Sequence, residues 1–185
     1  MKIHLKLGTI KDLDSVYDLH RKCFQEGDLW YKSIMGQYID NSLILELIDS
    51  NKIIGFLLQG KINILNNSDN LIFDNMNIEN TSDNTIDNKF IFINNDYSNK
   101  IDLKKKYNAI LLVCIDPDYR SKGLGKKLIN NFISMNNNEI SILHTRMSNY
   151  KAQKLYKDIG YISLGILKNN CIHPTEDSMV MIKYD

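Results

Sequence analysis

A basic, glycine-containing segment, Arg120–Lys127, has the residue types of an anion site. It follows a continuous apolar run and precedes an amphipathic stretch, so we expect it to join a buried strand to the start of a helix. The first N–H groups of a helix lack backbone partners and carry partial positive charge, which attracts anions. Gly123 and Gly125 have no side chains that would keep a phosphate away. Positive side chains surround the two glycines: Arg120, Lys122, Lys126 and Lys127. Together these features predict a ligand with a pyrophosphate group.

Two common phosphate-binding loops do not fit this segment. The P-loop pattern needs an earlier glycine and a Ser or Thr after the lysine, and Gly125-Lys126 has neither. The dinucleotide-binding pattern G-x-G-x-x-G needs a third glycine, which does not follow Gly125. The alternative is that the glycines only make a tight turn between a strand and a helix.

The segment Arg120–Gly125, with the pattern R-x-x-G-x-G, resembles the signature of the GNAT superfamily of acetyl-CoA-dependent N-acetyltransferases. The approach to it, Val113–Tyr119, is also similar to the family's fourth strand and the turn after it. A second family element, Asn149–Tyr161, follows in the same order with Ala152, Leu155-Tyr156 and Gly160 at its fixed positions. The resemblance covers residues 107–184 well and the first 62 residues only by the order of their elements. It implies that the cofactor is acetyl-CoA.

Within that superfamily, Leu143–Asn149 is most similar to the fifth strand of protein N-terminal acetyltransferases of the San (NatE) type and their Golgi-associated relative. A histidine five residues before the asparagine is the catalytic base there, and His144 has that place. The resemblance implies that Tyr156 gives a proton to the leaving CoA thiolate. It also implies that Asn149 reaches the cofactor or caps a helix. Residue type alone leaves open a structural strand histidine and a tyrosine that only packs on the sheet.

The chain differs from these enzymes at three places. The tyrosine that they pair with the histidine is Ala109 here, and Tyr107, two residues earlier on the same strand face, is the candidate to replace it. Asn170 and Cys171 stand where the family has an aromatic pair that grips the peptide. The peptide-gripping segment after the first helix is not evident in residues 24–31. These differences affect the acceptor more than the cofactor.

The resemblance also implies how the cofactor is held. The fourth and fifth strands are expected to splay apart, so that the pantetheine arm binds between them as a pseudo-strand and a backbone N–H polarises the thioester carbonyl. The pyrophosphate is expected on the amides of Ser121–Lys126. The cofactor-binding residues implied in this way are Val113, Cys114, Ile115, Arg120, Ser121, Lys122, Gly123, Leu124, Gly125, Lys126, Asn149, Ala152 and Tyr156.

The acceptor is expected to be a primary amine. An α-amine has a pKa of about 7.7–8.0, and a histidine near its usual pKa of about 6.5 can remove its proton. A lysine amine, with a pKa of about 10.4, needs more help. This comparison favours the α-amine of a protein N-terminus. An auxiliary subunit is a further candidate partner. The alternatives are acetylation of a polyamine, another small amine or a lysine, and a non-catalytic acyl-CoA-binding module.

The elements that position these residues predict an α/β (α+β) fold with one sheet. The resemblance implies that this is a single mixed, mostly antiparallel twisted sheet flanked by helices. The strand patterns cover residues 3–7, 42–48, 52–64, 107–115, 140–146, 161–167 and 179–184. The helix patterns cover residues 9–24, 31–38, a stretch that ends near 135, and 149–159. We expect one domain over residues 1–185, with an Asn-rich surface insertion at about 63–106. Within the insertion, Lys89–Ile93 alternates as an added strand would.

Composition limits the function further. A net charge of +1 argues against a general nucleic-acid binder, and no apolar run is long enough to span a bilayer. Three widely spaced cysteines without a C-x-x-C pattern argue against a disulfide framework and a zinc site. The histidines show no metal-ligand spacing. We therefore expect a cytoplasmic protein without a metal, and no nucleic acid or membrane as partner.

Overall fold

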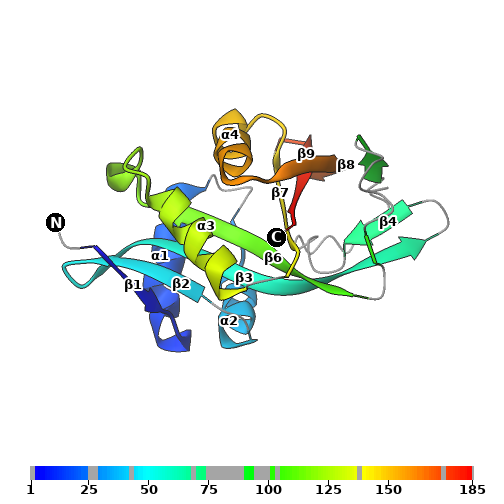
Figure 1. Ribbon diagram of the computed structural model, residues 1–185. Helices are drawn as coiled ribbons and strands as arrows, with labels where there is room; N and C mark the ends of the chain where they lie inside the picture. Colours follow the sequence, from blue (N-terminus) through cyan, green and yellow to red (C-terminus); the bar gives the residue numbers. More distant parts are fainter. Residues whose placement is uncertain are drawn as a thin grey trace. The chain divides into compact units, whose positions relative to one another are not determined.

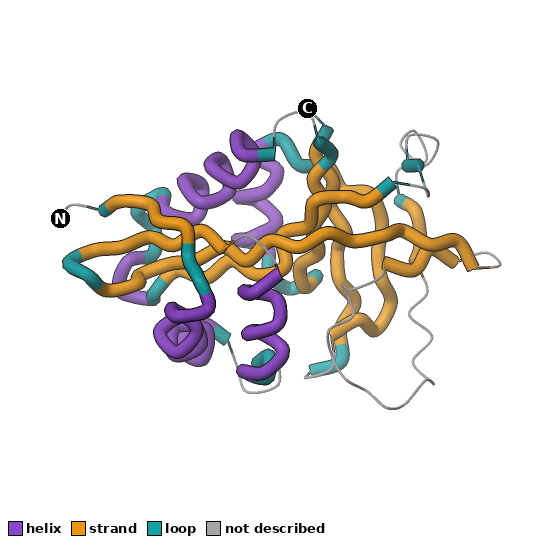
Figure 2. The backbone as a smooth tube through the Cα atoms, turned by 90° about the horizontal axis from the view of Figure 1, so that it is seen from below, coloured by secondary structure: helices purple, strands orange, loops and turns teal. Residues whose placement is uncertain are grey.

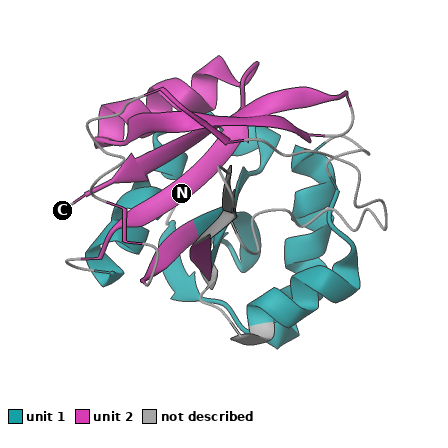
Figure 3. Ribbon diagram, turned by 90° about the vertical axis from the view of Figure 1, so that its right-hand side faces the viewer, with its two compact units in different colours: residues 1–60, 110–137 teal, residues 61–109, 138–185 magenta. Residues whose placement is uncertain are grey.

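The computed structural model describes residues 3–24, 29–41, 44–67, 70–73, 90–93, 101–102, 105–136, 139–171 and 174–184 (Figure 1). Strands make up much of the described chain, with helices between them (Figure 2). The chain divides into two compact units (Figure 3). The first contains Met1–Gly60 and Ile110–Asn137, and the second contains Lys61–Ala109 and Asn138–Asp185. Strands β3 (Lys52–Asn67) and β6 (Lys106–Ile115) have residues in both.

The first unit begins with antiparallel strands. Strand β1 (His4–Leu7) pairs with β2 (Ile44–Asp49), and β2 pairs with β3. Ser50 and Asn51 connect β2 to β3 with φ values of 51° and 66°. Two consecutive residues with positive φ form the tight hairpin whose twist matches that of the strands. Residues 42 and 43 of the predicted strand lie outside the described residues.

Two helices of the first unit build its core. A short 3₁₀ helix (Ile10–Asp12) leads into α1 (Leu13–Cys23), and α2 (Lys32–Asn41) follows. Thr9 and Asp12 start this region as predicted, because the Thr9 backbone N–H and hydroxyl both donate to the Asp12 carboxylate. Buried side chains from α1, α2, β2, β3 and β6 form one cluster: Val16, Leu19, Met35, Ile39, Ile48, Ile53, Phe56, Leu58, Leu112 and Cys114. The last long helix of this unit is α3 (Leu124–Met135).

The second unit is an antiparallel sheet with one helix. Strand β7 (Ser141–Arg146) pairs with β9 (Glu176–Lys183), β9 with β8 (Ile162–Cys171), and β8 with β5 (Phe90–Phe92). Helix α4 (Tyr150–Ile159) connects β7 to β8 and ends at Gly160, whose φ is 101°. A short strand, β4 (Asn70–Phe73), pairs with the end of β3. Strand β5 confirms the strand predicted in Lys89–Ile93.

The predicted fold class is confirmed. The strands follow the order β1-β2-β3-β6-β7-β9-β8-β5, every register that the structure gives is antiparallel, and helices connect the strands. Strands β8 and β9 are longer than expected, because polar residues near their ends pair across the hairpin, as Cys171 does with Glu176. The splay of the fourth and fifth strands stays a prediction, and so does the surface insertion, most of which lies outside the described residues.

Candidate active site

The predicted anion loop lies in the first unit, between β6 and α3. The chain leaves β6 at Asp116, forms a short 3₁₀ helix (Pro117–Tyr119) and enters α3 after Gly123. The Asp116 backbone N–H donates to the Ile54 carbonyl of β3 at 2.8 Å, which fixes the point of departure. The Asp116 carboxylate accepts the Asp118 N–H at 3.2 Å and so caps the 3₁₀ helix.

The start of α3 has the geometry of an anion cradle. Gly123 precedes the helix with a φ of 73°, and a Cβ built on it would meet no atom within 4 Å. The first helical hydrogen bond runs from Lys127 N–H to the Gly123 carbonyl. The N–H groups of Leu124, Gly125 and Lys126 therefore have no partner within the helix. The open space beside Gly123, the unpaired N–H groups of the first turn and the exposed Lys122, Lys126 and Lys127 nearby in sequence fit a pyrophosphate.

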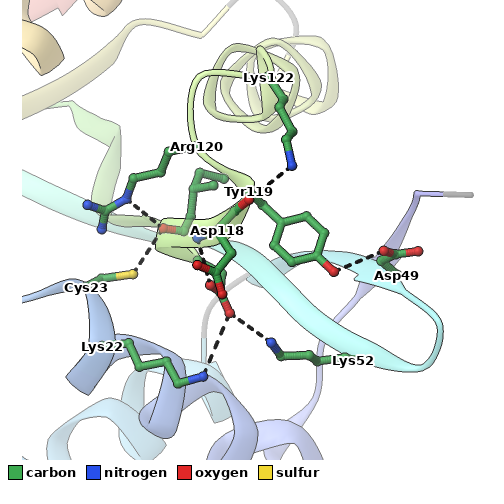
Figure 4. A network of polar contacts seen from close by, with 10 residues as sticks. Lys22, Cys23, Asp49, Lys52, Asp118, Tyr119, Arg120 and Lys122 are labelled. Atoms are coloured by element: carbon green, nitrogen blue, oxygen red, sulfur yellow. Dashed lines mark hydrogen bonds and ion pairs between the residues drawn. The ribbon is translucent and has the colours of Figure 1, made fainter. Parts of the chain in front are cut away.

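A network of charged residues holds the beginning of this loop (Figure 4). Asp116 is 2% exposed and pairs with Lys52 at 3.0 Å and Lys22 at 3.9 Å. Burial alone would raise the pKa of Asp116, but the Lys52 ammonium and the Asp118 N–H hold it below its usual value. The Tyr119 hydroxyl donates to Asp49 at 3.1 Å. The network joins the turn after β6 to α1 and to the hairpin of β2 and β3.

We expect Asp116→Asn to lower the free energy of unfolding by about 1–2 kcal/mol at pH 7, because the amide loses both ion pairs but can still cap. The native carboxylate has a lowered pKa, so its contribution is complete above the unfolded pKa, near 3.9, and is lost as pH falls through the native pKa. Urea unfolding should therefore separate the two proteins at pH 7, and the difference should disappear as pH falls through the native pKa of Asp116.

The matched control is Asp118→Asn, because Asp118 is exposed and lies in the same 3₁₀ helix. Its effect should stay within about 0.5 kcal/mol. Equal losses in the two variants would show that the ion pairs of Asp116 contribute nothing specific.

The end of β6 supplies the residues predicted to contact the pantetheine arm. Cys114 is buried, and Val113 and Ile115 are partly exposed. The Ile115 carbonyl accepts hydrogen bonds from Arg120 Nε at 3.0 Å and from the Cys23 thiol at 3.3 Å. This carbonyl is therefore already paired within the first unit, and Arg120 is turned back toward the strand (Figure 4).

His144 lies on β7 in the second unit, opposite Val180 of β9. It is partly buried, and burial lowers its pKa to about 4. The expected pKa near 6.5 is therefore wrong for the unliganded protein, because the sequence does not show how far water is excluded around a strand residue. His144 is neutral over the whole range near pH 7.

Asn170 of β8 contacts the His144 ring, with Nδ2 at 3.2 Å from Nδ1. An amide NH₂ group can only donate, so in this orientation Nδ1 accepts and the neutral ring carries its proton on Nε2. With the amide turned over, Oδ1 would accept from an Nδ1–H and Nε2 would be free to take a proton. Among the described residues the Asn170 Oδ1 has no partner. The sequence shows Asn170 only as a departure from an aromatic pair, since residues 144 and 170 meet through the pairing of separate strands.

Tyr107 is also in the second unit and is 2% exposed. Its hydroxyl donates to the Asp102 carbonyl at 3.0 Å and accepts the Asp102 N–H at 2.7 Å. Burial raises the pKa of this phenol. Both hydrogen bonds would have to break before Tyr107 could take part in catalysis, so its replacement of the missing family tyrosine stays a prediction.

The start of α4 holds the remaining predicted residues. Asn149 caps the helix, and its Oδ1 accepts the Ala152 N–H at 3.2 Å. Tyr156 is 8% exposed and packs edge to face on Tyr161 at a ring distance of 5.8 Å. Gln153, which the sequence analysis missed, donates to the Arg146 and Met147 carbonyls at 3.0 and 2.9 Å. These hydrogen bonds fix the turn after β7. The one signal for this role in the sequence is the position of Gln153 in the first turn of the predicted helix.

No group of three or more His, Cys, Asp and Glu residues in the described ranges could hold a metal ion. The helices of those ranges include none with both the length and the apolar character that a membrane span requires.

A comparison with protein-family models matches residues 13–161 to "Acetyltransferase (GNAT) family". A comparison with curated protein sequences found no match.

Solved structures of several acetyltransferases have a similar fold. Arabidopsis thaliana NAA60 in complex with acetyl-CoA has a TM-score of 0.70 at 18% identity, over 99% of this chain and 98% of that one. Arabidopsis thaliana Naa50 with the bisubstrate analogue CoA-Ac-MVNAL has a TM-score of 0.67 at 16% identity, over all of both chains (100% and 100%). The Escherichia coli ribosomal-protein-S18-alanine N-acetyltransferase has a TM-score of 0.68 at 16% identity, over 99% of this chain and 94% of that one. At these identities the likeness shows the fold.

Proposed function

The chain belongs to the acetyltransferase (GNAT) family, and we propose that it transfers the acetyl group of acetyl-CoA to the α-amine of protein N-termini. The Gly123 cradle at the start of α3 is the observation that supports the cofactor most directly. His144, placed on β7 as in the San-type enzymes that the sequence resembles, supports the acceptor. Two structural neighbours agree with this choice, since one is a ribosomal-protein-S18-alanine N-acetyltransferase and the other was solved with the bisubstrate analogue CoA-Ac-MVNAL.

We assign the pyrophosphate and the pantetheine arm of the cofactor to residues of the first unit. The amides of Leu124, Gly125 and Lys126 would hold the pyrophosphate, and Lys122 and Lys126 would add positive charge. Backbone groups of Val113–Ile115 would bind the pantetheine arm. When bound, acetyl-CoA supplies an acetyl group activated as a thioester.

Proton transfers are assigned to side chains of the second unit. His144 accepts the proton that the acceptor amine loses on acylation. Because burial keeps the ring neutral near pH 7, Nε2 can accept this proton when the Asn170 amide is turned so that Nδ1 carries the ring proton, although the ring is a weak base. Tyr156 is the proposed proton donor to the departing thiolate.

A screen of acceptors tests the proposal. The purified chain is incubated with labelled acetyl-CoA and with Met-initiated peptides, with the same peptides blocked at the α-amine, with polyamines and with lysine-containing peptides. Turnover of the free peptides and its loss on blocking would support acetylation of N-termini. Turnover of polyamines or lysines instead would support the small-amine or lysine alternative. Tight acetyl-CoA binding without any transfer would make the chain an acyl-CoA-binding module.

We further propose a reducing, cytoplasmic location. Cys23, Cys114 and Cys171 are not in disulfide bonds in this structure, which agrees with such a compartment. An auxiliary subunit stays a prediction.

The pH dependence of kcat/KM should follow the acceptor amine. His144, with a pKa of about 4, does not titrate between pH 5.5 and 9, and only the neutral amine can attack. The rate should therefore rise tenfold per pH unit below the amine pKa of about 7.7–8.0 and level off above it. Initial rates with one peptide in buffers of constant ionic strength measure the profile. If kcat/KM also fell below a pH of about 6.5, and this pH were the same for every peptide, the proposal that His144 stays neutral in this range would be contradicted.

Asn170→Asp is the matched control for this profile. Its carboxylate can only accept, so it would place a proton on Nδ1 and stabilise the charged ring, which raises the pKa of His144. We expect a second limb to enter the measured range in this variant. An unchanged profile would show that Asn170 does not control the His144 ring.

A further inference from the structure

Two cysteines lie together beside the anion loop, in the first unit. Cys23 is the last residue of α1 and packs against the core cluster that contains Cys114 of β6. The Cys23 thiol also lies 3.3 Å from the Ile115 carbonyl oxygen, which places it at the end of β6 (Figure 4).

The surroundings activate one of these thiols and not the other. The hydrogen bond from Cys114, together with the Arg120 guanidinium, lowers the pKa of Cys23 to about 7, although burial opposes this. Arg120 is held beside the sulfur because its Nε donates to the same Ile115 carbonyl. Burial raises the pKa of Cys114 well above its usual value, so Cys114 stays a thiol. A thiolate next to a protonated thiol is the arrangement of a reactive cysteine and its resolving partner.

The exposure of the two cysteines also favours Cys23 as the reactive residue and Cys114 as the resolving one. Cys23 is partly exposed and is therefore the more open of the two to a small oxidant. Cys114 is 1% exposed and can be reached through Cys23. Cys171, in the second unit, is buried on β8. Cys171 therefore serves as an internal control for the oxidation of Cys23 and Cys114.

We propose that Cys23 and Cys114 form a modification site for hydroperoxides, in which Cys23 is oxidised first and Cys114 then closes a disulfide. The Cys23 thiolate attacks one peroxide oxygen, the O–O bond breaks, and a sulfenic acid and hydroxide (or alkoxide) result. The Cys114 sulfur then attacks the sulfenic sulfur, the S–S bond forms, and the hydroxyl leaves as water with the thiol proton. In sum, two thiols are oxidised by two electrons and one hydroperoxide is reduced. The disulfide would tie the end of α1 to the strand that precedes the anion loop.

Treatment of the full chain with hydrogen peroxide at pH 7.5 tests this site without any use of acetyltransferase activity. Remaining thiols are alkylated, and proteolytic peptides are identified by mass before and after reduction with dithiothreitol. We expect a reducible link between the peptides that contain Cys23 and Cys114, and Cys171 alkylated throughout. The rate of oxidation should rise with pH around a midpoint near 7, the pKa of Cys23.

Three variants separate the roles. In Cys114→Ser the Cys23 sulfenic acid should persist and react with dimedone. In Cys23→Ser the oxidation of Cys114 should be at least ~10-fold slower than in the native chain. Cys171→Ser should behave like the native chain. Over-oxidation of Cys23 without a link to Cys114, or equal rates in Cys23→Ser and the native chain, would overturn the proposal. If a serine variant does not fold, the presence or absence of the Cys23–Cys114 disulfide in the peroxide-treated native chain still tests the proposal.

Discussion

Replacement of His144 with alanine is expected to lower kcat at least ~100-fold and to leave the affinity for acetyl-CoA nearly unchanged. A positioned general base contributes about 10²- to 10⁴-fold to a rate, and alanine cannot accept a proton. The residues assigned to the cofactor's pyrophosphate lie in the first unit, whereas His144 lies on β7 in the second. Steady-state kinetics with a free N-terminal peptide and calorimetric titration with acetyl-CoA measure the two quantities.

His4→Ala is the matched control for this variant, because His4 is an exposed histidine on β1. Its kcat should equal that of the native chain. A His144→Ala variant with unchanged kcat would transfer the base role to Tyr107 or to a chain of water molecules. A drop in kcat accompanied by a lower melting temperature would instead point to the lost contact with Asn170 and a structural role.

The second large effect is expected at the cofactor loop. Gly125→Leu places a branched side chain in the first turn of α3, where the proposed pyrophosphate meets the helix N–H groups. Loss of one or two charge-assisted hydrogen bonds, each worth about 1.5–3 kcal/mol, corresponds to about 100-fold weaker binding. Leucine favours helices more than glycine does, so the melting temperature should stay the same or rise. Titration calorimetry and a thermal scan separate the two effects.

Asn130→Leu provides the matched control, because Asn130 is exposed on the same helix and lies beyond its first turn. Its acetyl-CoA affinity should be unchanged. If Gly125→Leu also binds acetyl-CoA normally, the loop is only a turn between a strand and a helix, as the residue pattern alone allowed.

These two experiments depend on separate assignments. Failure at Gly125 removes the support for the pyrophosphate site and leaves the family assignment, which rests on residues 13–161 as a whole. Failure at His144 removes the proposed base and leaves the cofactor site. The peroxide experiment on Cys23 and Cys114 is independent of both.

Much of the fold was predictable because its signals are local. The cap at Thr9, the cap at Asn149 and the stop at Gly160 each act over three or four residues. The left-handed Gly123 before α3 also follows from a short pattern, because glycine reaches positive φ without a steric penalty. Alternation of apolar residues located most strands for the same reason.

The reactivity of the site residues was decided by tertiary structure. The pKa of His144 falls because the strand around it is buried, and the orientation of its ring depends on Asn170, 26 residues away. Cys23 becomes acidic through Cys114 and Arg120, and its thiol reaches a carbonyl 92 residues away. Desolvation and contacts between distant segments set these properties, and neither is encoded in the spacing of neighbouring residues. The sequence alone therefore determined the family, the elements and the candidate residues, whereas the folded chain decided which of those groups carry a proton.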